Sequence, residues 1–145
     1  LRIMGNSGCE LQPRLPGERA IIVGAARRLF PNIPVRIEVA DLSLIGDREE
    51  NQDRVAVVGA DPAVLLIAVD GMGGHADGAK AAQVAAETVR ETFSRQALPL
   101  LDPQGFLHLA IGRAHANVVA LGARLPLEQR PRATCAVCLV QDGGA

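Results

Sequence analysis

Two acidic motifs contain the residues of this chain that are best suited to chemistry. The first, over residues 48–53, reads Arg-Glu-Glu-Asn-Gln-Asp, and the second, over residues 70–75, reads Asp-Gly-Met-Gly-Gly-His. Carboxylates that lie together repel each other unless cations lie between them, and Mg²⁺ and Mn²⁺ prefer oxygen ligands. Arg48 has a planar guanidinium that can hold a phosphate group through two hydrogen bonds. These residue types indicate a site for hard metal ions and a phosphate.

The residues between the motifs predict an antiparallel hairpin that brings Asp53 and Asp70 together. Residues 54–58 are mostly β-branched and apolar, Asp61-Pro62 predicts a turn, and residues 63–69 form a continuous apolar run. Asp53 then lies at the start of one strand and Asp70 at the end of the next, which is the same end of the sheet. A continuous apolar run also predicts a strand that is buried on both faces under a second layer.

Three neighbouring residues complete the predicted site. Gly71 has no side chain, so its carbonyl can approach a metal closely. Asn51 and Gln52 have amide oxygens that can orient the metal ligands. Asp-Gly is also an ordinary turn dipeptide, and Asp is common at strand ends, so either motif alone has a structural interpretation. Both motifs together, in this order and at this spacing, favour the metal site.

The first third of the chain contains few regular patterns. Residues 1–34 are rich in Gly, Pro and Arg, which predicts a leader or linker. Within this segment, residues 18–30 could form a short amphipathic helix that Pro31 ends. Alternating apolar and charged residues predict a half-buried strand over 35–40. Residues 41–50 are polar and predict a loop.

The C-terminal half predicts two helices and a strand. A glycine loop at 71–74 leads into a helix over 76–95 with an apolar face at 3.6-residue spacing. Asp102-Pro103 predicts the start of a second helix. A loop over 125–132 and a strand over 134–140 follow. The apolar faces comprise Ala82, Ala85, Ala86, Val89 and Phe93 in the first helix, and Leu107, Ala110, Ile111, Ala114, Val118 and Leu121 in the second.

This element order predicts an α+β fold, because strands and helices do not alternate as in a doubly wound sheet. The turn residues at 141–144 predict a hairpin connection to a further strand. A chain of 145 residues can form one domain. We therefore divide it into a leader over 1–34 and one layered domain over 35–145.

Composition argues against several partners. The net charge is −1 with no block of like charges, and the only aromatic residues are three Phe, so no nucleic-acid partner is expected. The longest apolar run is far below the ~20 residues of a membrane span. Cys135 and Cys138 form a lone C-x-x-C in a predicted strand, where their side chains point to opposite faces. We interpret them as buried strand cysteines and expect a cytoplasmic protein without a disulfide framework.

The two motifs, with their intervening hairpin, closely resemble those of the metal-dependent Ser/Thr protein phosphatases of type 2C in their compact bacterial form. The similarity lies in Arg-x-x-Asn-Gln-Asp over 48–53 and Val-Asp-Gly-Met-Gly-Gly-His-x-x-Gly over 69–78, and it covers about residues 35–140. It implies an αββα layered β-sandwich flanked by helix pairs, with two Mn²⁺ or Mg²⁺ ions at one end. Asp53 and Asp70 would be metal ligands, Gly71 would contribute its carbonyl, and Arg48 would hold the substrate phosphate.

The activity that this resemblance implies is hydrolysis of phosphoserine and phosphothreonine in proteins, in opposition to a Ser/Thr kinase and without a phosphoenzyme. Met72 stands where some members carry a histidine, and we interpret His75 as structural. Residues 132–134 match the family's Gly-Thr-Thr only weakly. The chain ends at Ala145, before the family's Gly-Asp-Ser-Arg motif and two further aspartates. We therefore expect a fragment that lacks the C-terminal half, folds marginally and shows little or no turnover alone.

Two other functions fit parts of the pattern. A nucleotide-binding module would use the glycine loop before the helix, but the chain lacks a G-x-x-x-x-G-K-[ST] motif. An inactive interaction domain would bind a phosphoprotein through Arg48 without turnover. Binding of ATP without divalent metal would support the first, and phosphopeptide binding that persists in chelator would support the second.

Overall fold

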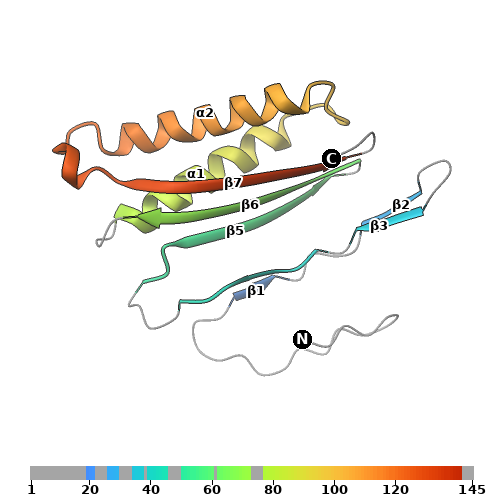
Figure 1. Ribbon diagram of the computed structural model, residues 1–145, viewed down its shortest axis with the longest axis horizontal. Helices are drawn as coiled ribbons and strands as arrows, with labels where there is room; N and C mark the ends of the chain where they lie inside the picture. Colours follow the sequence, from blue (N-terminus) through green and yellow to red (C-terminus); the bar gives the residue numbers. More distant parts are fainter. Residues whose placement is uncertain are drawn as a thin grey trace.

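A three-stranded antiparallel sheet carries two helices on one of its faces (Figure 1). The computed structural model describes residues 19–21, 26–29, 34–37, 39–45, 50–60, 62–72 and 77–141. The sheet has the strand order β5-β6-β7, and the helices α1 and α2 follow β6 in the chain. The α+β class predicted from the element order is therefore observed. The bounds of these elements are Asp53–Ala60 for β5, Ala63–Met72 for β6, Arg132–Gln141 for β7, Asp77–Ser94 for α1 and Pro103–Leu121 for α2.

The predicted hairpin is confirmed, and its second strand is longer than expected. β5 and β6 pair in register from Asp53 opposite Asp70 to Ala60 opposite Ala63, and Pro62 lies in the turn between them. β6 continues through Gly71 and Met72, which the sequence had placed in a loop. The physical reason is that β7 also extends, so that Ala133 and Arg132 pair with these two residues. The rest of the predicted glycine loop lies outside the described residues.

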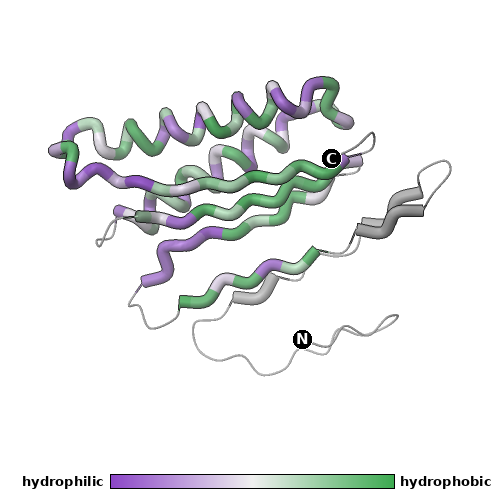
Figure 2. The backbone as a smooth tube through the Cα atoms, viewed as in Figure 1, coloured by the Kyte–Doolittle hydropathy of each residue, from purple (hydrophilic) through white to green (hydrophobic). Residues whose placement is uncertain are grey.

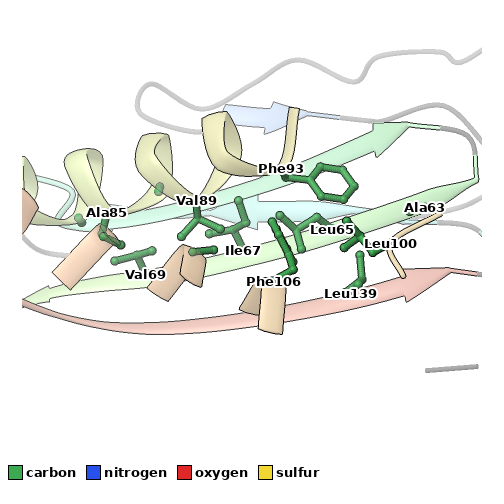
Figure 3. Close-up of a cluster of buried hydrophobic side chains, with 14 residues drawn as sticks. Ala63, Leu65, Ile67, Val69, Ala85, Val89, Phe93, Leu100, Phe106 and Leu139 are labelled. Atoms are coloured by element: carbon green, nitrogen blue, oxygen red, sulfur yellow. The ribbon is translucent and has the colours of Figure 1, made fainter. Parts of the chain in front are cut away.

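Helix α1 confirms the predicted helix and its apolar face. The five predicted apolar residues are buried, with Val89 and Phe93 almost fully enclosed. They pack on the residues of β6 that point to the same side, chiefly Leu65, Ile67 and Val69 (Figure 3). Burial of one such large side chain contributes about 1.5–3 kcal/mol. This layer of side chains is the core of the molecule.

Helix α2 begins where the sequence predicted. Asp102 is the N-cap, and its Oδ1 accepts a hydrogen bond of 2.8 Å from the backbone N–H of Gly105, while Pro103 occupies the first turn. The predicted apolar face is only partly correct. Ala110 and Ala114 are buried, but Ile111 is 42% exposed, and the buried Phe106 was not predicted.

The interaction of Phe106 with α1 explains the orientation of α2. Its ring centroid lies 5.7 Å from that of Phe93, with the two rings tilted at 59°. This contact rotates α2 so that Phe106, Ala110 and Ala114 point to the core, while Ile111 lies at the margin. Leu107 and Val118 are partly buried beside the core.

The two faces of the sheet differ, and the prediction that β6 is buried on both faces is only partly correct, because on the face away from the helices Val64 is buried but the residues after it are not. Leu65, Ile67 and Val69 are buried beneath the helices, whereas Leu66 is half-buried and Ala68 is exposed. Both helices lie on the same side of the sheet (Figure 1). The apolar run therefore reflects one covered face and one face that is open beyond Val64.

The N-terminal segment forms strands where a helix was expected. β1 (Arg19–Ile21) and β2 (Ala26–Leu29) occupy the segment predicted as a helix over 18–30, so that prediction is wrong. Ile21, Ile22 and Val23 are β-branched and Gly24 follows them, which lowers helix propensity and favours extended structure.

Each of these strands pairs with a later one. β2 pairs with β3 (Pro34–Ile37), which confirms the first part of the strand predicted over 35–40. β1 pairs with β4 (Asp41–Ser43), which lies in the segment predicted as a loop. The loop prediction failed there because its polar composition gave no sign of a partner strand. The remaining predicted loop, over 125–132, contains a short 3₁₀ helix (Leu127–Gln129) and ends where β7 begins at Arg132.

A side-chain amide joins the helix layer to the far end of the sheet. Gln141 at the end of β7 accepts a hydrogen bond from the N–H of Leu100 through its Oε1 and donates one to the carbonyl of Leu100 through its Nε2, both at 2.9 Å. Leu100 lies between α1 and α2 and is buried. The connection of the two helices is thereby fixed to the edge strand.

Candidate metal site

Asp53 and Asp70 face each other across the β5–β6 hairpin. They are register partners, and both are exposed. The N–H of Gly71 donates to the carbonyl of Gln52 at 3.1 Å, so Gln52 and Gly71 form a hydrogen-bonded pair. Because such pairs alternate in an antiparallel ladder, Asp53 and Asp70 form the type of pair in which opposite side chains come closest. The predicted meeting of these two residues is therefore confirmed, while their role as metal ligands stays a prediction.

Asp53 and Asp70 line a hollow at the polar end of the sheet. The hollow has a volume of about 280 Å³, and Figure 2 shows hydrophilic residues at this end of β5 and β6. It is lined by the two aspartates, by Glu50, Asn51 and Gln52 from the segment before β5, and by Leu44 and Ile45 after β4. A small hydrated ion or a phosphate group is of a size that this hollow can accept.

Asn51 holds the backbone beside the first carboxylate. Its Oδ1 accepts a hydrogen bond of 2.9 Å from the N–H of Asp53, which forms an Asx turn. Its Nδ2 donates to the hydroxyl of Ser43 at 2.8 Å and so connects β4 to the start of β5. The sequence predicted that the Asn51 amide oxygen orients the ligands, and the structure shows that oxygen engaged with the main chain of Asp53. No pattern in the sequence pointed to Ser43.

Gly71 is buried and lies against the first turn of α1. A Cβ atom at this position would lie 2.1 Å from the carbonyl oxygen of Gly78 and 2.9 Å from that of Gln52. The chain therefore needs glycine here so that helix and strand can approach closely. This reason differs from the predicted one, which was access of the Gly71 carbonyl to a metal; that role stays a prediction.

Arg54 is a member of this region that the sequence analysis did not single out. Its Nε donates to Oε1 of Gln83 on α1 at 2.7 Å, and its Nη1 donates to the carbonyls of Asn51 and Asp53, both at 2.8 Å. Gln83 in turn donates from Nε2 to Oε1 of Glu87. The alternation of side chains along the strand could have revealed Arg54, because it is the first residue of β5 whose side chain starts on the helix side of the sheet.

Arg48 and His75 of the two acidic motifs lie outside the described residues. The predicted phosphate contact of Arg48 is therefore not described. Met72, at the end of β6, is exposed.

The donor set fits a hard divalent cation in its chemistry. Asp53 and Asp70 have carboxylate oxygens on adjacent strands, and Glu50 and Gln52 line the same hollow. Within the part of the chain that the structure describes, no group of three or more His, Cys, Asp or Glu side chains is placed to hold one metal ion. The described residues thus provide two neighbouring carboxylates, those of Asp53 and Asp70.

The two strand cysteines differ from the prediction in one respect. They lie on β7 three residues apart, Cys135 is half-buried beside the core, and Cys138 is exposed, so only one of them is even partly buried. Alternation along the strand places them on opposite faces, as expected. Burial raises the pKa of the Cys135 thiol.

Comparison of the chain with protein-family models, curated proteins and solved structures finds no match. Among the described residues, no helix is long and apolar enough to cross a membrane.

Proposed function

We propose that this chain forms part of a metal-dependent phosphatase of type 2C, which hydrolyses phosphoserine and phosphothreonine in proteins. The single observation that supports the proposal most is the register of the hairpin, which sets Asp53 directly opposite Asp70. Both belong to the two motifs on which the resemblance rests. Two acidic side chains at a closest-approach position repel each other, and a divalent cation between them removes that repulsion.

The proposed ligands of the cation are Asp53, Asp70 and the carbonyl of Gly71, with Arg48 holding the substrate phosphate. Mn²⁺ or Mg²⁺, two ions in the intact site, supply Lewis acidity and activation of water when they are bound. The chain itself contributes orientation. Asn51 fixes the backbone of Asp53 through its side-chain oxygen, and the Gln52–Gly71 hydrogen bond holds the ladder closed beside the pair.

The proposal extends to the fold. The resemblance implies an αββα sandwich, in which a second sheet covers the face that presents the carboxylates. Val57 and Leu66, which are register partners on that face, are half-buried apolar side chains. Such a face is suited to packing against another sheet, with the acidic pair at its rim. Phosphorylated proteins are the proposed substrates, and a Ser/Thr kinase is the proposed opponent.

The first test is binding of Mn²⁺ to the 145-residue chain, followed by the electron paramagnetic resonance signal of free Mn²⁺. We expect Asp53→Asn and Asp70→Asn each to weaken binding by about tenfold or more, because ligand charge and number set the affinity for such ions. Glu91→Gln is a matched control, since it removes one carboxylate near the end of α1 from an exposed pair with Arg95. Equal binding by all four proteins would contradict the proposal.

The second test concerns turnover. In a full-length phosphatase of the kind that the resemblance implies, Asp70→Asn should abolish Mn²⁺-dependent hydrolysis of a phenyl phosphate ester. Undiminished turnover in that variant would refute the assignment. The alternative, an inactive phosphoprotein-binding domain, predicts binding that does not require metal. A phosphoserine peptide would then bind in the presence of chelator, and Arg48→Met would abolish that binding.

A further inference from the structure

We propose that Arg54 is a positioning residue, whose guanidinium holds the main chain of Asp53 in the orientation that the carboxylate pair requires. Its effect on metal binding rests on the proposed function, whereas its effect on the backbone does not. The observation that supports this proposal is that one guanidinium contacts the carbonyls of Asn51 and Asp53 and the side chain of Gln83.

β5 is an outer strand of the described sheet. Asp53 and Asp70 form a pair without cross-strand hydrogen bonds, so the N–H and C=O of Asp53 point away from β6. Within the described sheet, β5 has a neighbour only on the β6 side. The two backbone groups of Asp53 are therefore not paired within the sheet. The N–H finds Oδ1 of Asn51, and the carbonyl finds Nη1 of Arg54.

Arg54 is itself anchored to helix α1. Arg54 pairs with Val69, whose side chain is buried beneath the helices, so Arg54 starts on the helix side of the sheet. Its Nε is held by Gln83 of α1, and Gln83 is held by Glu87 one turn later. The guanidinium thus connects the rigid helix to the two carbonyls that flank the carboxylate. A planar fork with several fixed donors suits this task, and a lysine ammonium does not reproduce it.

Positioning by Arg54 and its positive charge act on the metal affinity in opposite directions. A positive charge beside a cation site opposes cation binding, so its removal alone would raise the affinity for Mn²⁺. Loss of positioning acts in the other direction, since residues that orient metal ligands typically contribute about 10–100-fold to metal affinity. The sign of the change in Arg54 variants therefore distinguishes the two roles.

The experiment uses the whole 145-residue chain and compares Arg54→Lys, Arg54→Met and Gln83→Met with the wild type. Arg113→Met, an exposed site on α2, is the control for loss of one positive charge. Two quantities are measured: the Mn²⁺ affinity, and hydrogen exchange of the Asp53 amide in metal-free protein. Thermal unfolding of each variant establishes that it is folded, and Gln83→Met serves where an Arg54 variant does not fold.

We expect both Arg54 variants to bind Mn²⁺ about tenfold more weakly, with faster exchange at Asp53, and Gln83→Met to show a smaller change of the same sign. Wild-type affinity in Arg54→Lys with raised affinity in Arg54→Met would overturn the inference in favour of a charge effect. Unchanged exchange at Asp53 in Arg54→Met would overturn it whether or not the protein binds metal. A wild type that binds no Mn²⁺ would overturn the proposed function, and exchange alone would then decide the role of Arg54.

Discussion

The two faces of the β5–β6–β7 sheet differ in what their residues do, although the residues alternate along the same strands. On the face beneath α1 and α2, Leu65 and Ile67 are completely enclosed. On the other face, Leu66 is half-buried and Asp70 is exposed. Neighbouring residues of one strand are therefore divided between the enclosed core and the open face that carries the proposed metal ligand. A carboxylate on the helix side would lose its hydration, which costs several kcal/mol, whereas on the open side it stays available to a ligand.

The largest test of this comparison uses two adjacent leucines. Leu65→Ala should lower the free energy of unfolding by about 2–5 kcal/mol, because it leaves a cavity in the packed core. Leu66→Ala should cost about 1 kcal/mol or less, since the side chain is half-exposed. Urea unfolding followed by circular dichroism measures both. Equal losses would show that the open face is covered in solution.

The second test uses one glycine from each face. Gly71→Ala would force a Cβ onto the Gly78 carbonyl, and we expect a loss of about 1–3 kcal/mol. Gly59→Ala introduces a Cβ with no atom within 4 Å and should be neutral or stabilise by up to about 1 kcal/mol. The shift of thermal midpoint measures both changes. A tolerated Gly71→Ala would mean that α1 can move away from β6.

The third test compares the two strand thiols. The raised pKa of Cys135 lowers its thiolate fraction at any pH below that pKa, and its partial burial limits access. Cys138 should therefore react several-fold faster with iodoacetamide at pH 8, and the gap should narrow as pH rises through the pKa of Cys135. Rates are measured in Cys135→Ser and Cys138→Ser variants that also carry Cys9→Ser. A faster Cys135 would contradict the assignment of faces.

The smallest expected effect is on the carboxylate pair itself. Without divalent metal and at low salt, Asp70→Asn should raise the free energy of unfolding by about 0.2–1 kcal/mol, because like charges directly opposite each other destabilise a sheet. The gain should diminish at 1 M NaCl through screening. The same measurement on Glu91→Gln provides the baseline. A loss of stability in Asp70→Asn would show that the two carboxylates do not repel.

The elements that could be predicted from sequence are those whose signals are local and repeated. The apolar residues of α1 recur with 3.6-residue spacing, and Asp102 followed by Pro103 predicts the start of α2 from cap chemistry alone. The hairpin followed from two apolar runs around Asp61-Pro62, and its register then placed Asp53 opposite Asp70. These predictions needed no knowledge of distant contacts.

The parts that were missed depend on contacts between segments far apart in the chain. β4 forms because Asp41–Ser43 meets Arg19–Ile21, and a three-residue strand has no periodicity to reveal it. The orientation of α2 is set by Phe106 meeting Phe93, which a count of apolar residues on α2 cannot supply. Arg54 was overlooked for the same reason, because its importance arises from Gln83, which lies 29 residues later.

The hydrogen bonds between Gln141 and Leu100 have a mechanical consequence when they are considered with those of Arg54. The Gln141 hydrogen bonds connect the α1–α2 connection to the outer strand β7 at the end remote from the aspartates. The Arg54 hydrogen bond to Gln83 connects α1 to the opposite outer strand β5 at the end near the aspartates. Attachment at two diagonal corners resists shear, so the helical layer cannot slide along the strands as a unit without breaking one attachment. Loss of the Gln141 hydrogen bonds would release the α1–α2 connection from β7, while the attachment of α1 to Arg54 beside Asp53 would remain.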